Sequence, residues 1–223
     1  MVDEIIETPN YNQKKREIAL YFSEIISFKN DKNRDDFFKI LKSNVYLMLY
    51  NMIESTVKEI LSAVYDQINI SNIPYNNLSD SLKGVWESHQ FFHLDSGGSN
   101  KIMSYKKETH TMIKKVLDRC SVRFNDGYVS ISGNADLDAI FKIMQTHGIA
   151  IKMDSIGKYK HEFYEIKFQR NNLAHGSTSF VETGRDTTTD QLQKMINDTE
   201  KCIDEIIKDV SKYLNQKKYL KMT

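Results

Sequence analysis

The sequence predicts a mainly α-helical protein with a small β-hairpin insertion. Apolar side chains recur every three or four positions through most of the chain, which is the period of an amphipathic helix. Only two prolines and nine glycines interrupt the 223 residues, too few for the many turns of a sandwich or barrel. Residues 121–132 instead alternate apolar and polar side chains around Asn-Asp-Gly, a pattern typical of a hairpin.

Two helices are predicted in the N-terminal third, followed by a shorter one. Residues 11–28 carry an apolar stripe, and a long, largely buried helix follows between Phe37 and Ile68. Two rows of apolar side chains support this long helix: Phe37, Leu41, Val45, Met48 and Met52, and then Ile53, Val57, Ile60, Val64 and Ile68. A turn around Pro74 ends it, and residues 78–92 form a helix around the single tryptophan.

The middle of the chain, about residues 95–150, is predicted to be an insertion. Asp-Ser-Gly-Gly-Ser-Asn at 95–100 is a flexible break, and 101–119 is a basic helix. After the hairpin, a helix spans about 135–147, with Asn134 as its N-cap and Gly148 at its C-terminal end.

Two further helices are predicted in the last third. The first covers about 156–175 and stops at Gly176, and residues 176–190 have no hydrophobic period and are predicted to be a loop. Thr188 and Gln191 form a capping box for the last helix. Core helices at about 11–70 and 156–215 together with the insertion make one domain over residues 1–223.

Composition argues against several classes of protein. With 40% hydrophobic and 27% charged residues the chain can bury a core, and a net charge of +1 gives no global field for nucleic acid or membrane. The N-terminus is acidic where a signal peptide is basic, and the longest apolar run, Val45–Tyr50, is too short to span a bilayer. Two cysteines without a CxxC spacing suit a reducing compartment. We therefore predict a cytoplasmic protein without membrane contact.

No metal or cofactor site is predicted. His89 and His93 have the i, i+4 spacing that can chelate zinc, but Gln-Phe-Phe between them offers no acid, and a third ligand would have to come from elsewhere. We favour a purely structural interpretation of both histidines.

One arginine stands out on the penultimate helix. The apolar stripe there runs Tyr159, Phe163, Ile166, Arg170, Leu173, so a guanidinium occupies a position where the period calls for an apolar residue. A guanidinium stays charged and is costly to bury alone. Arg170 must therefore pair with an acid, for instance Glu54, or face a subunit contact, or await an anion.

A histidine and an asparagine accompany this arginine. His175 follows Arg170 by five residues, in the last turn, and Asn171 lies one helical repeat before His175 on the same side. The partial negative charge at a helix C-terminus favours an imidazolium that can donate a proton. The alternative is that Arg170 makes an internal ion pair and His175 is only a C-cap group, which the spacing taken alone favours.

The string RNNLAHG, Arg170–Gly176, resembles the signature of HEPN domains (higher eukaryote and prokaryote nucleotide-binding): an arginine, a polar residue, and a histidine after a short spacer. Three segments in the same order resemble the MAE-type bacterial HEPN nuclease group: LMLYNMIESTVKEILSAVYDQI, ISGNADLDAIFKIMQTHGI and RNNLAHGSTSFVETGRDTTTDQL. The resemblance covers the chain from about Asp36 to the C-terminus and implies a HEPN-like helical bundle.

The resemblance also implies an activity. HEPN ribonucleases are dimers that bring the motif of each chain to the interface and cut RNA without metal or cofactor. Arg170 and His175 would then be catalytic, Asn171 would orient a phosphate oxygen or the imidazole, and Glu54 with Asn51 would support Arg170 from behind. A toxin or antiviral defence role, with an antitoxin or regulatory protein as partner, would follow.

Basic residues suggest where RNA binds. Residues 101–123 hold seven Lys/Arg against two acids, including Lys106, Lys107, Lys114 and Lys115, and such a stripe can track a phosphate backbone. A solvated helix face explains it equally well. Arg185 can reach the same phosphate as His175, or hold its loop by pairing with Glu182.

Two other functions compete with the ribonuclease. A non-catalytic HEPN dimer would keep the motif as an interface while it binds RNA or nucleotide or scaffolds a partner. A zinc-dependent hydrolase ranks well below both.

Overall fold

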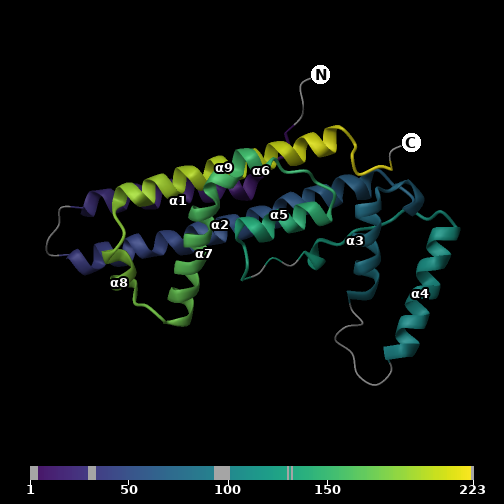
Figure 1. Ribbon diagram of the computed structural model, residues 1–223, viewed down its shortest axis with the longest axis horizontal. Coiled ribbons are helices and arrows are strands. Elements are labelled where there is room, and N and C mark those ends of the chain that lie inside the picture. Colours follow the sequence, from purple (N-terminus) through teal and green to yellow (C-terminus); the bar gives the residue numbers. More distant parts are fainter. Residues whose placement is uncertain (1–4, 30–33, 93–100, 130, 132, 222–223) are drawn as a thin grey trace.

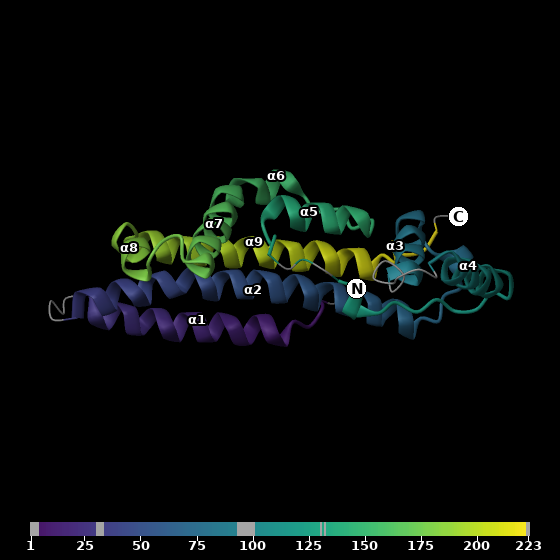
Figure 2. The same ribbon diagram turned by 90° about the horizontal axis from the view of Figure 1, so that it is seen from below.

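The computed structural model describes residues 5–29, 34–92, 101–129, 131 and 133–221 and is mainly helical. Three long helices lie side by side: α1 (Pro9–Phe28), α2 (Asp35–Ile70) and α9 (Thr189–Asn215) (Figures 1 and 2). These helices confirm the predicted N-terminal pair and the last helix. The capping box of Thr188 and Gln191 is present at the start of α9.

The centre of the fold is α2, which is covered by α1, α9, α7 (Lys160–His175) and α8 (Phe180–Arg185). Both predicted apolar rows contribute to one contiguous core, in which Val45, Met52, Ile53, Val64 and Ile68 are fully buried. A helix that is apolar over so much of its circumference needs neighbours on several sides, and α7 and α8 supply two of them.

The helix that carries Arg170 and His175 crosses the long helices. A helical turn, α6 (Met153–Ile156), and a 3₁₀ turn, η5 (Gly157–Tyr159), lead into α7 (Lys160–His175), which passes over α2 (Figure 1). Gly176 ends α7 with a left-handed φ of +69°, as its position predicts.

The prediction of a loop at residues 176–190 is wrong in part. These residues contain a short helix, α8 (Phe180–Arg185), which packs on α2. Ser179 and Glu182 form a capping box at its start, so the sequence held a local signal for it. Six residues are too few to show a hydrophobic period.

The predicted β-hairpin is wrong within the described residues. The buried side chains of Val122 and Phe124 dock beside the end of α2, where the backbone N–H of Val122 donates to the carbonyl of Ile73 (2.8 Å). The Asn69 amide bonds both polar backbone groups of Phe124, at 2.8 and 3.0 Å. The segment therefore alternates because an extended chain packs on a helix, and Asn-Asp-Gly leads into a 3₁₀ turn, η4 (Asp126–Tyr128).

Three further helices follow α2 in the chain: α3 (Asp80–Phe91), α4 (Lys101–Leu117) and α5 (Leu137–Thr146), and α3 contacts both of the others. The N-cap of α5 is Asp136, whose carboxylate accepts the N–H of Ala139 (2.8 Å), and not Asn134 as predicted. Gly148 follows α5 with a φ of +71°, as expected of a C-terminal glycine. The predicted flexible break at 95–100 lies outside the described residues.

Within the described ranges, no helix combines the length and the hydropathy that a bilayer crossing requires.

Candidate functional site at the end of α7

The guanidinium of Arg170 rests on an aromatic ring. Its Cζ lies 4.0 Å from the centroid of the Tyr50 ring, and Tyr50 is fully buried in the middle of α2. A cation over an aromatic face is stabilised by the ring quadrupole without losing its charge. The phenol oxygen of Tyr50 in turn accepts the backbone N–H of Ala135 (3.3 Å), which ties the ring to the segment before α5. The sequence does not single out Tyr50, because its ring fits the apolar pattern of a buried helix.

The ion pair between Arg170 and Glu54 is not formed. Glu54 instead binds Lys58 one turn along α2, at 2.8 Å, and Arg170 makes no ion pair with any described residue. Its Nη1 donates to the side-chain oxygen of Asn171 (2.8 Å). Support of Arg170 by Glu54 and Asn51 is therefore corrected: Tyr50 occupies the position on α2 that faces the guanidinium, and Asn51 is exposed.

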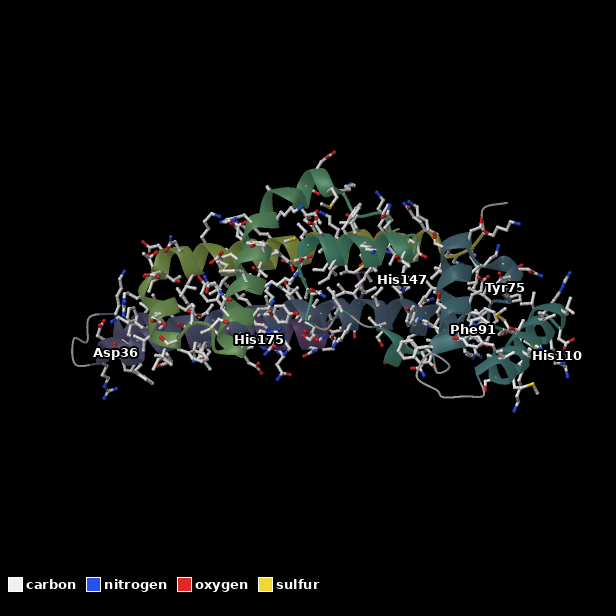
Figure 3. All side chains as sticks on the ribbon, turned by 60° about the horizontal axis from the view of Figure 1, so that its bottom comes forward. Asp36, Tyr75, Phe91, His110, His147 and His175 are labelled. Atoms are coloured by element: carbon white, nitrogen blue, oxygen red, sulfur yellow. The ribbon has the colours of Figure 1, made fainter. Side chains whose placement is uncertain are left out.

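The side chain of His175 is exposed at the C-terminal end of α7 (Figure 3). The N–H groups of Gly176 and Ser177 donate to the carbonyls of Leu173 and Asn172, so the end of the helix is closed by backbone. His175 is therefore not needed as a cap, and no described residue hydrogen-bonds its ring. Arg170 and His175 are five residues apart and lie about 140° apart around α7, so one chain does not bring them face to face.

An aromatic pair continues the face of α7 that carries His175. Tyr164 and Phe168 are 57% and 45% exposed, and their rings are stacked at 6.1 Å. The spacings from Tyr164 through Phe168 and Asn171 to His175 are four, three and four residues, so the four side chains share one side of the helix. The helical period of the sequence could have identified this pair. Phe163 and Ile166 belong to the buried stripe of the helix, so Tyr164 and Phe168 must lie outside it.

A cleft of about 610 Å³ lies between α7, α8 and α9, and neither Arg170 nor His175 lines it. Its charged lining is mostly acidic, with Glu162, Glu165, Glu182 and Asp186 against Lys194. Lys194 binds Glu162 (2.5 Å) and Asp198 (2.8 Å), so its charge is already compensated. A phosphate would be repelled here, which leaves the exposed end of α7 as the candidate site.

The predicted substrate-binding cations are spread along the molecule. Arg185 is exposed in the last turn of α8, after the turn that follows His175. The Glu182 carboxylate accepts the backbone N–H of Ser179 (2.9 Å), and its pKa is lowered by that hydrogen bond first and by Arg185 only as a minor contribution. Glu182 therefore serves the capping box, and no ion pair with Arg185 is formed within the described residues.

The four lysines at 106, 107, 114 and 115 lie on α4, beside the end of α2 that is remote from α8 and the tip of α7 (Figure 1). His110 of α4 and His175 are widely separated along the molecule (Figure 3). The structure does not bring these lysines to the Arg170–His175 region of the same chain.

Two buried histidines belong to the core. His147 donates from Nδ1 to the carbonyl of Ile143 (2.7 Å), so its neutral ring accepts the Tyr65 hydroxyl at Nε2 (2.7 Å). His89 lies among the rings of Tyr65, Phe124 and Tyr128. This enclosure supports the structural interpretation of His89, and His93 lies outside the described residues. Among those residues, no group of three His, Cys, Asp or Glu side chains is placed to hold a metal ion.

We expect the enclosed His89 to make stability depend on pH. Burial, with a smaller contribution from His147, lowers the pKa of His89 from 6.5 to about 4. The unfolded chain then takes up a proton near pH 6.5 that the folded chain takes up only near pH 4, so stability is lost as the pH falls through this window. From pH 7.5 to 5 the loss is about 2 kcal/mol. Urea midpoints at both pH values measure it.

His89→Phe keeps a ring in the same place and removes this titration, so the contribution of His89 should disappear. His147, whose pKa burial also lowers, keeps its own contribution. His110→Phe, at an exposed histidine, is the matched control and should keep the full dependence. An unchanged dependence in His89→Phe would contradict the assignment to His89.

Comparison with protein families matches residues 2–219 to the HEPN_MAE_28990-like HEPN family. Neither the curated proteins nor the solved structures contain a match to this chain.

Proposed function

Because the chain belongs to the HEPN_MAE_28990-like HEPN family, we propose that it is a metal-independent endoribonuclease with Arg170 and His175 as its catalytic residues. One observation carries the proposal: an exposed histidine that caps nothing lies at the end of the same helix as an arginine fixed on Tyr50. Asn171, bonded to that arginine, stands between them in the site.

The chemistry suits these two side chains. A neutral imidazole of His175 takes the proton of a ribose 2′-hydroxyl, whose oxygen then bonds to the adjacent phosphorus. Arg170 stabilises the negative charge that develops on the phosphate oxygens. The bond from phosphorus to the 5′ oxygen breaks, and this oxygen receives a proton from a second imidazole in its protonated form, that of His175 of the other chain. The products are a 2′,3′-cyclic phosphate and a 5′-hydroxyl, and DNA resists because it lacks the attacking hydroxyl.

Two chains are needed for this scheme. One imidazole cannot be base and acid in the same step, and Arg170 and His175 of one chain point to different sides of α7. We propose a homodimer in which the faces carrying Tyr164, Phe168, Asn171 and His175 meet about a two-fold axis, so that each chain supplies one His175. The Arg170 guanidinium reaches this contact beside Asn171, to which it donates a hydrogen bond. The exposed aromatic pair would then be buried.

Incubation of the purified protein with a 5′-labelled RNA in excess EDTA tests the activity. Cleavage that leaves 2′,3′-cyclic phosphate ends, with the matching DNA oligonucleotide intact, is the expected result. RNA that is bound but left intact would instead favour the non-catalytic HEPN dimer. Cleavage that EDTA abolishes and zinc restores would favour the hydrolase.

The biological setting that we propose is that of a toxin or antiviral defence effector in the cytoplasm. An RNA-cleaving enzyme in a cell needs a partner or a trigger that restrains it, so an antitoxin or regulatory protein is part of the proposal. Arg185, exposed on α8, remains a candidate for RNA binding outside the reacting phosphate.

Tyr50 should act on cleavage through Arg170. We expect Tyr50→Leu to lower kcat about tenfold, because the cation–ring interaction is worth about 1–2 kcal/mol at a desolvated site. Tyr50→Phe keeps the ring and should retain cleavage within about twofold, while losing about 1 kcal/mol of stability with the hydrogen bond to Ala135. Single-turnover cleavage and urea unfolding of both variants separate positioning from stability. Equal losses of cleavage in both would contradict positioning by the ring.

A charge on the aromatic pair should break the dimer. We expect Phe168→Glu to be monomeric in sedimentation and to lose RNA cleavage, because the substitution places two carboxylates at the two-fold contact. Ile26→Glu, on α1, introduces the same charge at a side chain with the same 45% exposure and should remain a dimer. A dimeric, active Phe168→Glu protein would show that the chains associate through another face.

A further inference from the structure

The outward side of α4 is apolar and basic at once. Ile102, Met103 and Leu117 are 69–76% exposed and Ile113 is 49% exposed, a concentration of bare aliphatic side chains on one helix. Lys106 stands among them, four residues after Ile102 and seven before Ile113, and a shallow groove of about 460 Å³ lies over these three residues. We name Ile102, Met103, Lys106, Ile113 and Leu117 the α4 outer face.

The opposite side of α4 is already occupied. Met112 and Val116 pack against the core, and Tyr105 stacks on Phe91 of α3 at 5.7 Å. Lys115 donates to Gln90 of α3 (3.2 Å). The helix is therefore held in place by its inner side, and no described residue covers the α4 outer face. Lys107 and Lys114 flank this face, and both are exposed.

We propose that the α4 outer face docks an acidic amphipathic helix of a partner protein. The aliphatic side chains of that helix would cover Ile102, Ile113 and Leu117, and its carboxylates would pair with Lys106, Lys107 and Lys114. The composition of the surface defines the partner. The three lysines favour Asp and Glu on the partner helix, and the aliphatic side chains favour an apolar stripe beside those acids. This interaction is independent of the proposed RNA cleavage.

Other occupants fit less well. A phosphate backbone would use the lysines but would leave four large aliphatic side chains against hydrated phosphates, where they gain nothing. A bilayer would bury the aliphatic side chains, but Lys106 lies in the middle of the stripe and not at its margin. The same face of a second copy would set lysines against lysines.

Fluorescence titration with a synthetic probe tests the proposal. The probe is an 18-residue helix with leucine at the i, i+3, i+4 positions of one face and glutamate on its flanks, and its control is a scrambled peptide of the same composition. We expect the probe to bind the full-length protein at least tenfold more tightly than the scrambled peptide. Ile102→Ser/Leu117→Ser and Lys106→Glu/Lys114→Glu should each weaken binding of the probe at least tenfold.

Leu20→Ser, at an exposed leucine of α1, is the matched control and should bind the probe like the wild type. No binding of the probe, or equal binding to all variants, would overturn the proposal. The same titrations use an uncleavable 2′-O-methyl RNA and vesicles of phosphatidylcholine with phosphatidylglycerol. Tighter binding of either one that needs both the lysines and the aliphatic side chains would also overturn it, in favour of RNA or of a lipid surface.

Discussion

Replacement of His175 by alanine is expected to lower RNA cleavage about 1,000-fold, because proton transfer by a placed side chain contributes about 10² to 10⁴ in rate. The variant should fold normally, since the ring is exposed and the end of α7 is closed by the N–H groups of Gly176 and Ser177. Single-turnover cleavage of a labelled RNA measures the rate, and urea unfolding measures the stability. His161→Ala, at another exposed histidine of α7, is the matched control and should keep full activity.

The partner substitution Arg170→Ala should cost about 10² to 10³ in rate through lost stabilisation of charge on the phosphate. Arg170→Lys keeps the charge but loses the planar group that stacks on Tyr50, so it should recover only part of the rate. Full cleavage by His175→Ala or by Arg170→Ala would contradict the assignment of the catalytic residues, whether or not the variant is a dimer.

The largest effect on stability is expected from Gly184→Ala. A Cβ atom at Gly184 would lie 1.9 Å from the carbonyl oxygen and 2.8 Å from the Cα of Lys39, which are backbone atoms of α2 that cannot rotate away. The two helices would have to separate, so we expect a loss of about 3 kcal/mol in the free energy of unfolding. Urea denaturation measures it.

Gly84→Ala is the matched control. Gly84 lies in α3 with no atom within 4 Å of the added methyl, so the substitution should be neutral or stabilise by up to about 1 kcal/mol. If Gly184→Ala is as stable as Gly84→Ala, the result would contradict the close contact between α8 and α2 at Gly184.

Hydrogen bonds reinforce the contact between α8 and α2. Ser43 donates to the carbonyl of Phe180, Lys42 donates to the carbonyl of Thr187, and Tyr46 bonds the Thr187 hydroxyl (3.1 Å). These bonds hold the chain on α2 just after His175. A hydrophobic pattern cannot predict them, because they join side chains of one helix to backbone groups about 140 residues away.

The hairpin shows where pattern and structure separate. Val122 and Phe124 are buried, as the alternation implies. Their backbone groups bond the carbonyl of Ile73, just after the end of α2, and the side-chain amide of Asn69, and not a second strand. Alternation reports which side chains are buried. It does not report which backbone groups they bond, and that choice depends on the amide of Asn69 lying within reach.

The sequence by itself determined the helical class, the course of α1, α2, α7 and α9, the end of α7 at Gly176 and the arginine out of place on its apolar stripe. Those features follow from local periods and capping, which act between residues a few positions apart. Only the tertiary structure decided what satisfies Arg170. Its partners are the Tyr50 ring and Asn171 and not Glu54, because the crossing of α7 over α2 sets which residue of the buried helix lies beneath the guanidinium.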